Sequence, residues 1–153
     1  MSELGKRVIF VGPADDANHK PLNVEGVATA AGILPGSVLG FAAADAGLEV
    51  NPAAATVFGQ LFLVADKDQM RSRSVDDAWT INENMVAIQP RSGEFVNVLV
   101  VTGQVILKGM ALSRSATPGA LKIALTDGTE EIVGYADETI TTTATQLVCV
   151  RVA

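Results

Sequence analysis

The two side chains most often used in acid–base and nucleophilic chemistry, histidine and cysteine, each occur once in this 153-residue chain. His19 stands between Asn18 and Lys20 in a polar stretch, which supplies neither the fixed position nor the orienting partner that a general base needs. Cys149 stands in an apolar run without a neighbouring base, so we expect it to pack as a small hydrophobic residue. One Cys and one His can form neither a zinc site nor an intrachain disulfide.

Carboxylates occur as three adjacent pairs, Asp15–Asp16, Asp76–Asp77 and Glu130–Glu131. Neighbouring side chains point to opposite faces of a strand and lie about 100° apart around a helix, so none of these pairs predicts an acid–base dyad. All three stand beside turn-forming residues, where solvated carboxylates are common.

Two short segments partly match ligand-binding loops. Asp66–Lys67–Asp68 resembles the start of a calcium loop, but Arg71 and Asp77 stand where such a loop needs glycine and glutamate. The segment 32–36 (GILPG) lacks the lysine and the helix of a phosphate loop. The sequence therefore predicts no catalytic residue, no metal and no cofactor, and we do not expect an enzyme.

The charge pattern bears on partners. The formal net charge is −6, and the eleven Lys and Arg residues are spread along the chain without a basic cluster. Only seven residues are aromatic (five Phe, one Tyr and one Trp). A nucleic-acid partner is therefore not expected. Charged residues make up only 18%, which fits a surface partly covered by other subunits and a slightly apolar monomer equally well.

One segment is long enough to suggest a membrane helix. Residues 26–44 contain no charge, but Gly32, Pro35, Gly36 and Gly40 interrupt them, and Pro35–Gly36 indicates a turn. The N-terminus opens with charged residues and has no signal-peptide pattern. We expect no membrane partner.

The last fifty residues repeat one pattern of short apolar runs separated by glycine-containing turns. Strands are predicted at 104–107, 110–113, 120–124, 131–136 and 146–152. In the last run, Val148, Val150 and Val152 share one face. Short strands at this spacing are typical of a sandwich or a barrel. The sequence therefore predicts a mainly β, compact sandwich-like or barrel-like domain with at most one or two short helices.

Further strands are predicted before this region, at 37–41 and 48–50 around an Asp45–Ala46–Gly47 turn, and at 85–89 and 94–101 around a Pro90–Gly93 turn. Residues 57–65 are apolar on both faces and predict a buried strand, with a two-turn helix as the alternative. Residues 66–84 are polar and predict mostly loop, in which Ser74 could begin a short helix ending near Trp79.

The N-terminal 26 residues differ from the rest in their pattern of apolar and polar residues. A short β-type run, Val8, Ile9, Phe10 and Val11, is followed by a polar stretch with two prolines. We expect residues 1–26 to form an extended arm, with residues 27–153 as the β-rich domain. The four apolar residues favour docking of the arm onto another surface, and a frayed terminus is the alternative.

One segment offers a second functional interpretation. Residues 105–112 (VILKGMAL) resemble the lysine-glycine strand of biotinyl and lipoyl carrier modules, which present a modified lysine at a hairpin tip. A β-rich carrier or ligand-binding module of the barrel-sandwich type, with Lys108 as the modified residue, is therefore the alternative function.

The order of motifs along the chain resembles the small capsid decoration, or cement, proteins of tailed bacteriophages. The resemblance is carried by Pro35–Gly36 before the first hairpin, Val75–Trp79 in the polar loop, Pro118–Gly119, the segment 132–138 (IVGYADE) and the terminal valine strand. It extends over about residues 27–153.

This resemblance implies a non-enzymatic structural protein of the virion that is made in the host cytoplasm and binds the outer surface of the assembled head. Its partners would be the major capsid protein and further copies of itself, as a homotrimer, with a dimer or a monomer left open. It would bridge neighbouring capsomers and stabilise the shell against internal pressure. Val8, Ile9, Phe10 and Val11 are the expected capsid contacts.

Overall fold

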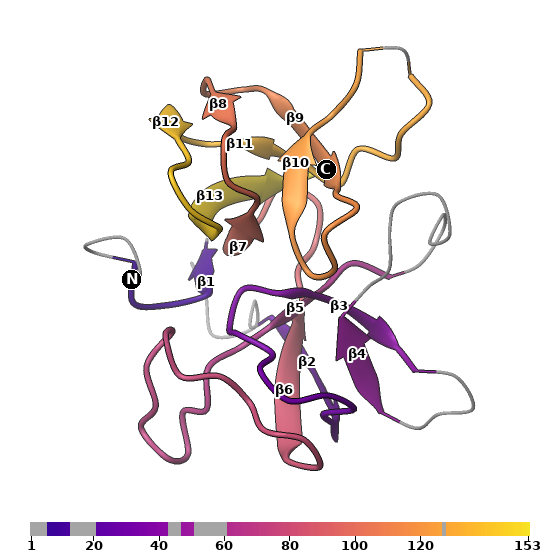
Figure 1. The fold of residues 1–153 in the computed structure, drawn as a ribbon, viewed down its shortest axis with the longest axis vertical. Helices are drawn as coiled ribbons and strands as arrows, with labels where there is room; N and C mark the ends of the chain where they lie inside the picture. The colour runs from indigo at the N-terminus through magenta and orange to yellow at the C-terminus, as the bar shows by residue number, and fades with distance from the viewer. Residues whose placement is uncertain (1–5, 13–20, 43–46, 51–60, 127) are drawn as a thin grey trace.

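In a computed structural model, the chain folds into a β-barrel stacked on a second, curled β-sheet (Figure 1). The structure describes residues 6–12, 21–42, 47–50, 61–126 and 128–153. Within these ranges all regular structure is β, in thirteen strands and without a helix. The predicted mainly β, barrel-like class is thus confirmed.

The barrel contains five strands that close on themselves. In order around the barrel these are β7 (Phe95–Val100), β10 (Leu121–Ile123), β9 (Ala111–Arg114), β11 (Gly134–Ala136) and β13 (Gln146–Val152). Pairing of β13 with β7 closes the ring, and only the β10–β7 pair is parallel. A short strand, β1 (Phe10–Gly12), pairs with β7 beside β10.

Alternation along β7 and β13 explains how the barrel core forms. Val96 and Val98 of β7 stand opposite Val150 and Val148 of β13, and all four side chains are fully buried. β-branched residues at alternate positions fill one face of a pleated sheet well. The predicted common face of Val148, Val150 and Val152 is therefore confirmed.

The paired strands of the second sheet are all antiparallel. Its strands follow the order β2 (Leu22–Val27), β6 (Asn84–Gln89), β5 (Leu63–Ala65), β3 (Val38–Phe41) and β4 (Leu48–Val50). The sheet curls so that Ala28, just after β2, forms a bridge with Leu48 of β4. Its own core includes Leu39, Leu63, Met85 and Trp79. The indole Nε1 of Trp79 donates a hydrogen bond to the main-chain oxygen of Asp66 at 2.8 Å, which ties the polar loop to this core.

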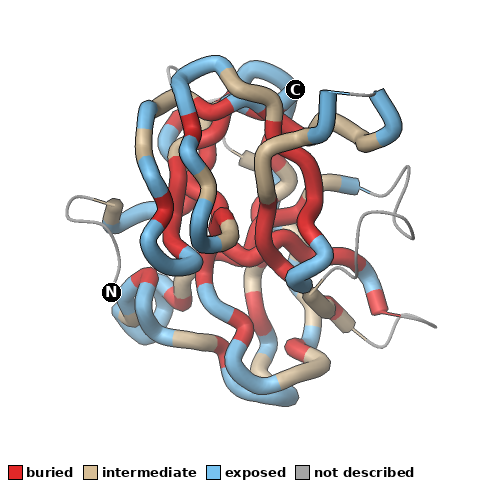
Figure 2. The backbone as a smooth tube through the Cα atoms, turned by 45° about the horizontal axis from the view of Figure 1, so that its top comes forward, coloured by how far each residue is buried: buried red, intermediate tan, exposed pale blue. Residues whose placement is uncertain are grey.

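Main-chain hydrogen bonds join the sheet to the barrel. The amide of Val38 donates to the oxygen of Gly119 at 2.9 Å, and the amide of Leu99 donates to the oxygen of Gly36 at 2.9 Å. Val38, Val64 and Ile88 of the sheet also belong to the buried cluster of the barrel. Buried segments accordingly run through both parts and across their junction in Figure 2. Burial shared between the two parts makes them one packed unit.

A two-stranded ribbon, β8 (Val105–Ile106) with β12 (Ile140–Thr141), lies outside the barrel ring. Ile106 and Ile140 stand opposite each other, and the buried Ile106 side chain packs into the barrel cluster. Strand β12 falls in the Thr- and Ala-rich segment that showed no strand pattern.

The structure corrects the expected division at residue 26, which falls inside β2. The whole of β2 pairs with β6, from Leu22 with Gln89 to Val27 with Asn84. Residues 22–26 therefore belong to the second sheet and not to an arm. The polar residues of this segment suggested a separate region, but β2 is an edge strand of the sheet, and an edge strand tolerates polar, exposed side chains.

Other details of the sequence analysis have mixed outcomes. The helix considered at Ser74–Trp79 does not form, and these residues make turns, in agreement with the predicted loop. The predicted strand at 57–65 is described only from residue 61, and β5 covers Leu63–Ala65. Gly47 closes the β3–β4 hairpin by accepting a hydrogen bond from Ala42, whereas Asp45 and Ala46 lie outside the described residues.

Candidate interaction surface

The four expected contact residues do not share one environment. The Ile9 side chain is fully buried in the barrel cluster, and Phe10 packs against that cluster. Val8 and Val11 are about half exposed. This segment thus packs on the chain's own barrel, and of the four residues Val8 and Val11 have the most exposed side chains.

Cys149 of β13 is half-buried, and burial raises the pKa of its thiol. Its amide donates to Glu138 Oε1 at 2.6 Å, and the same carboxylate forms an ion pair with Lys6. A raised thiol pKa lowers the fraction of reactive thiolate at neutral pH. His19 lies outside the described residues.

The carboxylates of the polar loop form turns and ion pairs. Asp77 accepts a hydrogen bond from the Ser74 amide at 2.7 Å, which lowers its pKa. The Glu83 carboxylate accepts a hydrogen bond from the Thr80 amide at 2.8 Å and pairs with Arg73 and Arg71. These bonds lower the pKa of Glu83 to about 2.

Asp66 lies at the base of this loop. Burial raises its pKa against the opposing hydrogen bonds from the Lys67 amide and the Gln69 side chain. Within the described ranges, no group of three His, Cys, Asp or Glu residues is placed to bind a metal ion.

The lysine of the carrier-like segment lies in the turn between β8 and β9. These two strands do not pair with each other, since β8 pairs with β12 and β9 pairs with β10 and β11. Lys108 is therefore not at the tip of a hairpin. Its side chain is 67% exposed and forms an ion pair with Asp137 at 3.2 Å.

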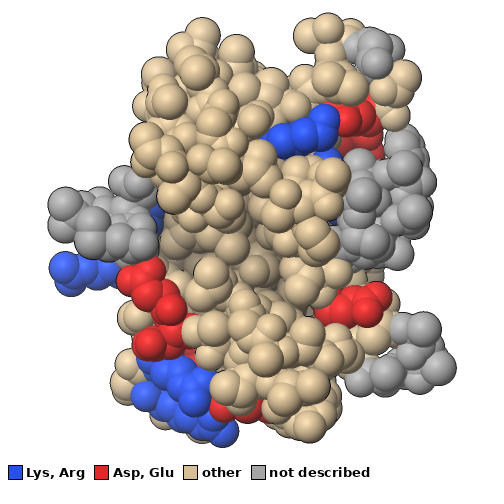
Figure 3. All heavy atoms as spheres, in the orientation of Figure 1, with Lys and Arg blue, Asp and Glu red and all other residues tan. Residues whose placement is uncertain are grey.

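An uncharged part of the surface surrounds the β8–β12 ribbon. Figure 3 shows neither acidic nor basic side chains over the upper left of the molecule, where Figure 1 places β8 and β12. Val105 and Leu107 are 63% and 52% exposed here. We call this surface the β8–β12 face, and its exposed residues are Thr102, Gly103, Val105, Leu107, Thr139, Thr141, Thr143, Ala144 and Thr145. The exposed Lys108 lies at its edge, where its amide donates a hydrogen bond to Thr139 Oγ1 at 3.1 Å.

Hydrogen bonds hold the two segments of this face side by side. Thr142 Oγ1 accepts from the Gln104 amide at 2.8 Å and donates to the Val101 oxygen at 2.7 Å. The Gly103 amide donates to the Thr142 oxygen at 2.7 Å. Thr142 itself is buried, so the exposed residues around it are presented on a fixed main chain.

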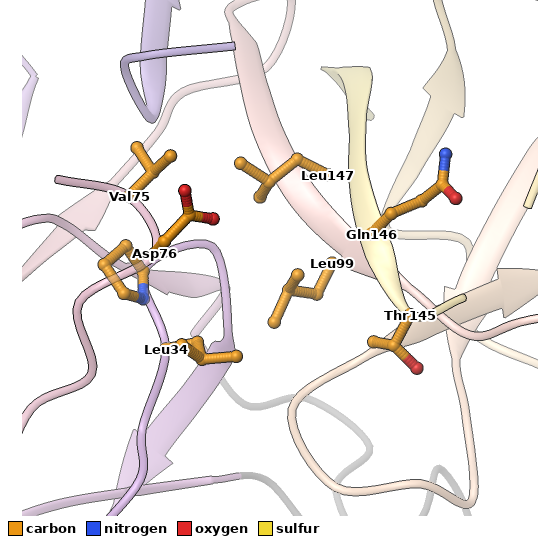
Figure 4. A pocket seen from close by; sticks show the side chains of 8 residues that line it. Leu34, Val75, Asp76, Leu99, Thr145, Gln146 and Leu147 are labelled. Atoms are coloured by element: carbon orange, nitrogen blue, oxygen red, sulfur yellow. The ribbon is translucent and has the colours of Figure 1, made fainter. Parts of the chain in front are cut away.

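A pocket of about 360 Å³ adjoins this face at the junction of barrel and sheet (Figure 4). Its apolar wall combines Leu99 of β7 and Leu147 of β13 with Leu34 and Val75 from the sheet side, and Asp76 and Gln146 add polar groups to the lining. Figure 4 shows the side chains of Leu34, Leu99 and Leu147 directed toward the same space. Thr145 lines the pocket and belongs to the β8–β12 face, so the two surfaces are continuous.

The face and the pocket were not found from the sequence, although one signal was present. Residues 95–107 and 139–150 contain no charged residue, which is unusual for segments that also carry exposed positions. Their proximity depends on the β8–β12 and β7–β13 pairings, which join residues far apart in the chain.

Searches of protein-family models and of curated protein sequences find no match to this chain. In the described part of the chain, no helix has the length and apolar character needed to cross a membrane.

Proposed function

We propose that this protein is a capsid decoration protein that binds the outside of an assembled phage head and bridges neighbouring capsomers. The observation that carries the proposal is the β8–β12 face with its adjoining pocket. A surface held by hydrogen bonds, with exposed Val105 and Leu107 and without charged residues, shares with interface cores the depletion of charge. The ordered motifs shared with decoration proteins support the same conclusion.

The pocket supplies a binding mode for one apolar anchor residue. Interfaces derive most of their binding free energy from a few side chains that enter well-packed pockets. An apolar side chain of the major capsid protein would displace water from Leu34, Leu99 and Leu147, and Thr145 would lie at the rim of the contact. Binding as a homotrimer, or as a dimer, would multiply modest individual contacts into stable attachment.

Cryo-electron microscopy of heads tests the proposal directly. Heads assembled in the presence of the protein should carry additional density on their outer surface, and heads assembled without the gene should lack it. The added purified protein should restore the density and raise the temperature at which the heads release DNA. Heads with identical outer surfaces in the two preparations would refute the proposal.

A carrier or ligand-binding module is the second candidate, since Lys108 is exposed, although it does not lie at the hairpin tip that carrier modules use. A carrier lysine must be accessible to a modifying enzyme, and the 67% exposed side chain meets this requirement. The intact mass of the protein isolated from its natural host distinguishes the two functions. A biotinyl or lipoyl increment that is lost in Lys108→Arg would establish the carrier, and an unmodified mass would remove it.

A further inference from the structure

The segment Lys6–Gly12 occupies a site on the barrel that the barrel strands leave open. Strand β10 pairs with β7 only at its far end, through Leu121 and Val100. Strand β1 takes the near end of the same edge, with Phe10 opposite Val96 and Gly12 opposite Phe95. We call this edge of β7, with the flanking residues that hold the segment, the β1 site.

Both main chain and side chains of the segment are bound there. The amide of Asn97 donates to the Ile9 oxygen at 2.8 Å, and Asn97 Nδ2 donates to the Val8 oxygen at 2.8 Å. The Ile9 side chain is buried in the barrel core. An extended segment that adds a strand to a sheet and fills one pocket with an alternate side chain is a recurring mode of peptide recognition.

The segment Lys6–Gly12 makes its contacts with residues that are far from it in the sequence. Arg7 accepts a hydrogen bond from Lys67, Val8 accepts one from Asn97, and Lys6 pairs with Glu138, at sequence separations of 60, 89 and 132 residues. The same contacts can therefore be made by the segment of another copy. Exchange of an identical element is a low-cost route to a closed oligomer.

The connection to the rest of the chain is long enough for exchange. Eight residues, 13–20, separate Gly12 from Pro21, and an extended chain spans at most about 3.3–3.6 Å per residue. Gly12 and Pro21 are nine residues apart in the chain, so their Cα atoms can lie up to about 30 Å from each other.

From this we infer that copies of the chain assemble by exchanging Lys6–Gly12, so that the segment of one copy occupies the β1 site of the next. Each exchanged segment buries its Ile9 side chain in a neighbouring barrel, so each copy completes the fold of another copy. The inference concerns self-association and is independent of binding to a head.

Disulfide trapping tests the exchange. Phe10→Cys and Val96→Cys, in a Cys149→Ser background, place two thiols at directly opposed positions of antiparallel strands, where Cβ atoms lie about 4.5–5.5 Å apart. One thiol is introduced into each of two separately purified chains, which are mixed, unfolded, refolded together at about 1 mM and oxidised. Disulfides between the two variants that exceed the unspecific background require the segment of one chain to occupy the site of the other.

Exchange predicts a covalent dimer in this mixture, and covalent dimers or closed rings when one chain carries both cysteines. Lys6→Cys with Glu138→Cys provides a second pair at the same site and guards against a distorting substitution in the core. Chains with a single cysteine, refolded alone, give the background of unspecific disulfides. Interchain links no more frequent than this background in both pairs would overturn the inference, as would a double-cysteine chain that forms only intrachain links.

Discussion

Gly119 of the turn between β9 and β10 lies directly against Val50 of β4, so that a Cβ atom on Gly119 would be 2.2 Å from Val50 Cγ1. The oxygen of the same glycine accepts the hydrogen bond from Val38 that joins the sheet to the barrel. A residue without a side chain is therefore required where the two halves of the molecule meet. The close approach also positions the second sheet relative to the barrel.

Gly119→Ala should destabilise the protein more than Gly93→Ala. Both glycines have a positive φ, +80° and +87°, so both substitutions incur the strain of a left-handed backbone, roughly 1–2 kcal/mol. A Cβ on Gly93 would have no heavy atom within 4 Å, whereas a Cβ on Gly119 overlaps Val50, and overpacking adds about 1–3 kcal/mol. Urea unfolding followed by circular dichroism measures both. Equal losses of stability would show that the junction adapts to the extra methyl group.

Ile9→Ala should cost about 2–5 kcal/mol of stability, because it leaves a cavity in the barrel core. Val11→Ala, in the same strand but about half exposed, should change stability by less than about 0.5 kcal/mol. A similar small effect of both substitutions would mean that the segment does not pack in the barrel in solution.

Removal of residues 1–26 extends this prediction. If residues 1–26 formed an arm outside the domain, as the sequence suggested, the shortened chain would stay folded. In the structure, the deletion removes β1 and all but the last residue of β2, which exposes one edge of β6. We therefore expect the shortened chain to lose its cooperative thermal transition, whereas a chain lacking only residues 1–5 should retain it. A cooperative transition at the original temperature in the shortened chain would contradict this.

The contrast between β13 and β2 shows which features could be predicted from the sequence. Strand β13 was located at its correct bounds because its valines alternate and its flanks contain no competing pattern. Strand β2 was missed because Asn23 and Glu25 made it resemble the polar stretch before it, and only its pairing with β6 makes it regular. Local pattern thus predicts strands with a strong apolar face, whereas edge strands depend on a partner that the pattern does not identify.

The same reasoning applies to the interaction surface. The sequence suggested that Val8–Val11 docks on another surface, whereas in the structure β1 pairs with β7 of the same chain, 80 or more residues away. The β8–β12 face arises from two runs that are unremarkable individually and meet only in the folded protein. Pairing between distant segments, which one sequence does not reveal, accounts for both errors.

Lowering the pH should show how much the ionised Glu83 carboxylate stabilises the folded protein at the polar loop. The pKa of this carboxyl is about 2 in the folded protein against an ordinary value of 4.5, mainly because of the hydrogen bond from the Thr80 amide and the pairing with Arg73. A lowered pKa means that the folded state favours the ionised form, so this contribution is complete above pH 4.5 and is lost as the pH falls toward about 2.

Glu83→Gln should therefore be less stable than the natural chain at pH 7, and the difference should shrink between pH 4.5 and 2. Urea unfolding at several pH values measures the two curves. Glu25→Gln, at an exposed position on β2, controls for the loss of one negative charge. A difference that stays constant down to pH 2 would show that the ionised carboxylate does not stabilise the loop.

Charge placed on the β8–β12 face should weaken binding to heads without affecting the fold. Val105→Glu adds a carboxylate to an exposed position at the centre of this face, and a charge enclosed in an apolar interface without a partner is strongly unfavourable. We expect at least about a tenfold loss of affinity, equivalent to about 1.4 kcal/mol, in co-sedimentation with heads that lack the natural protein.

Met70→Glu, at a 96% exposed position on the polar loop, adds the same charge outside the face and should bind normally. Both variants should unfold at nearly the natural temperature, since substitutions at exposed positions change stability little. Equal affinities of the two variants would exclude the β8–β12 face as the contact with the head, because only one of them carries the new charge there.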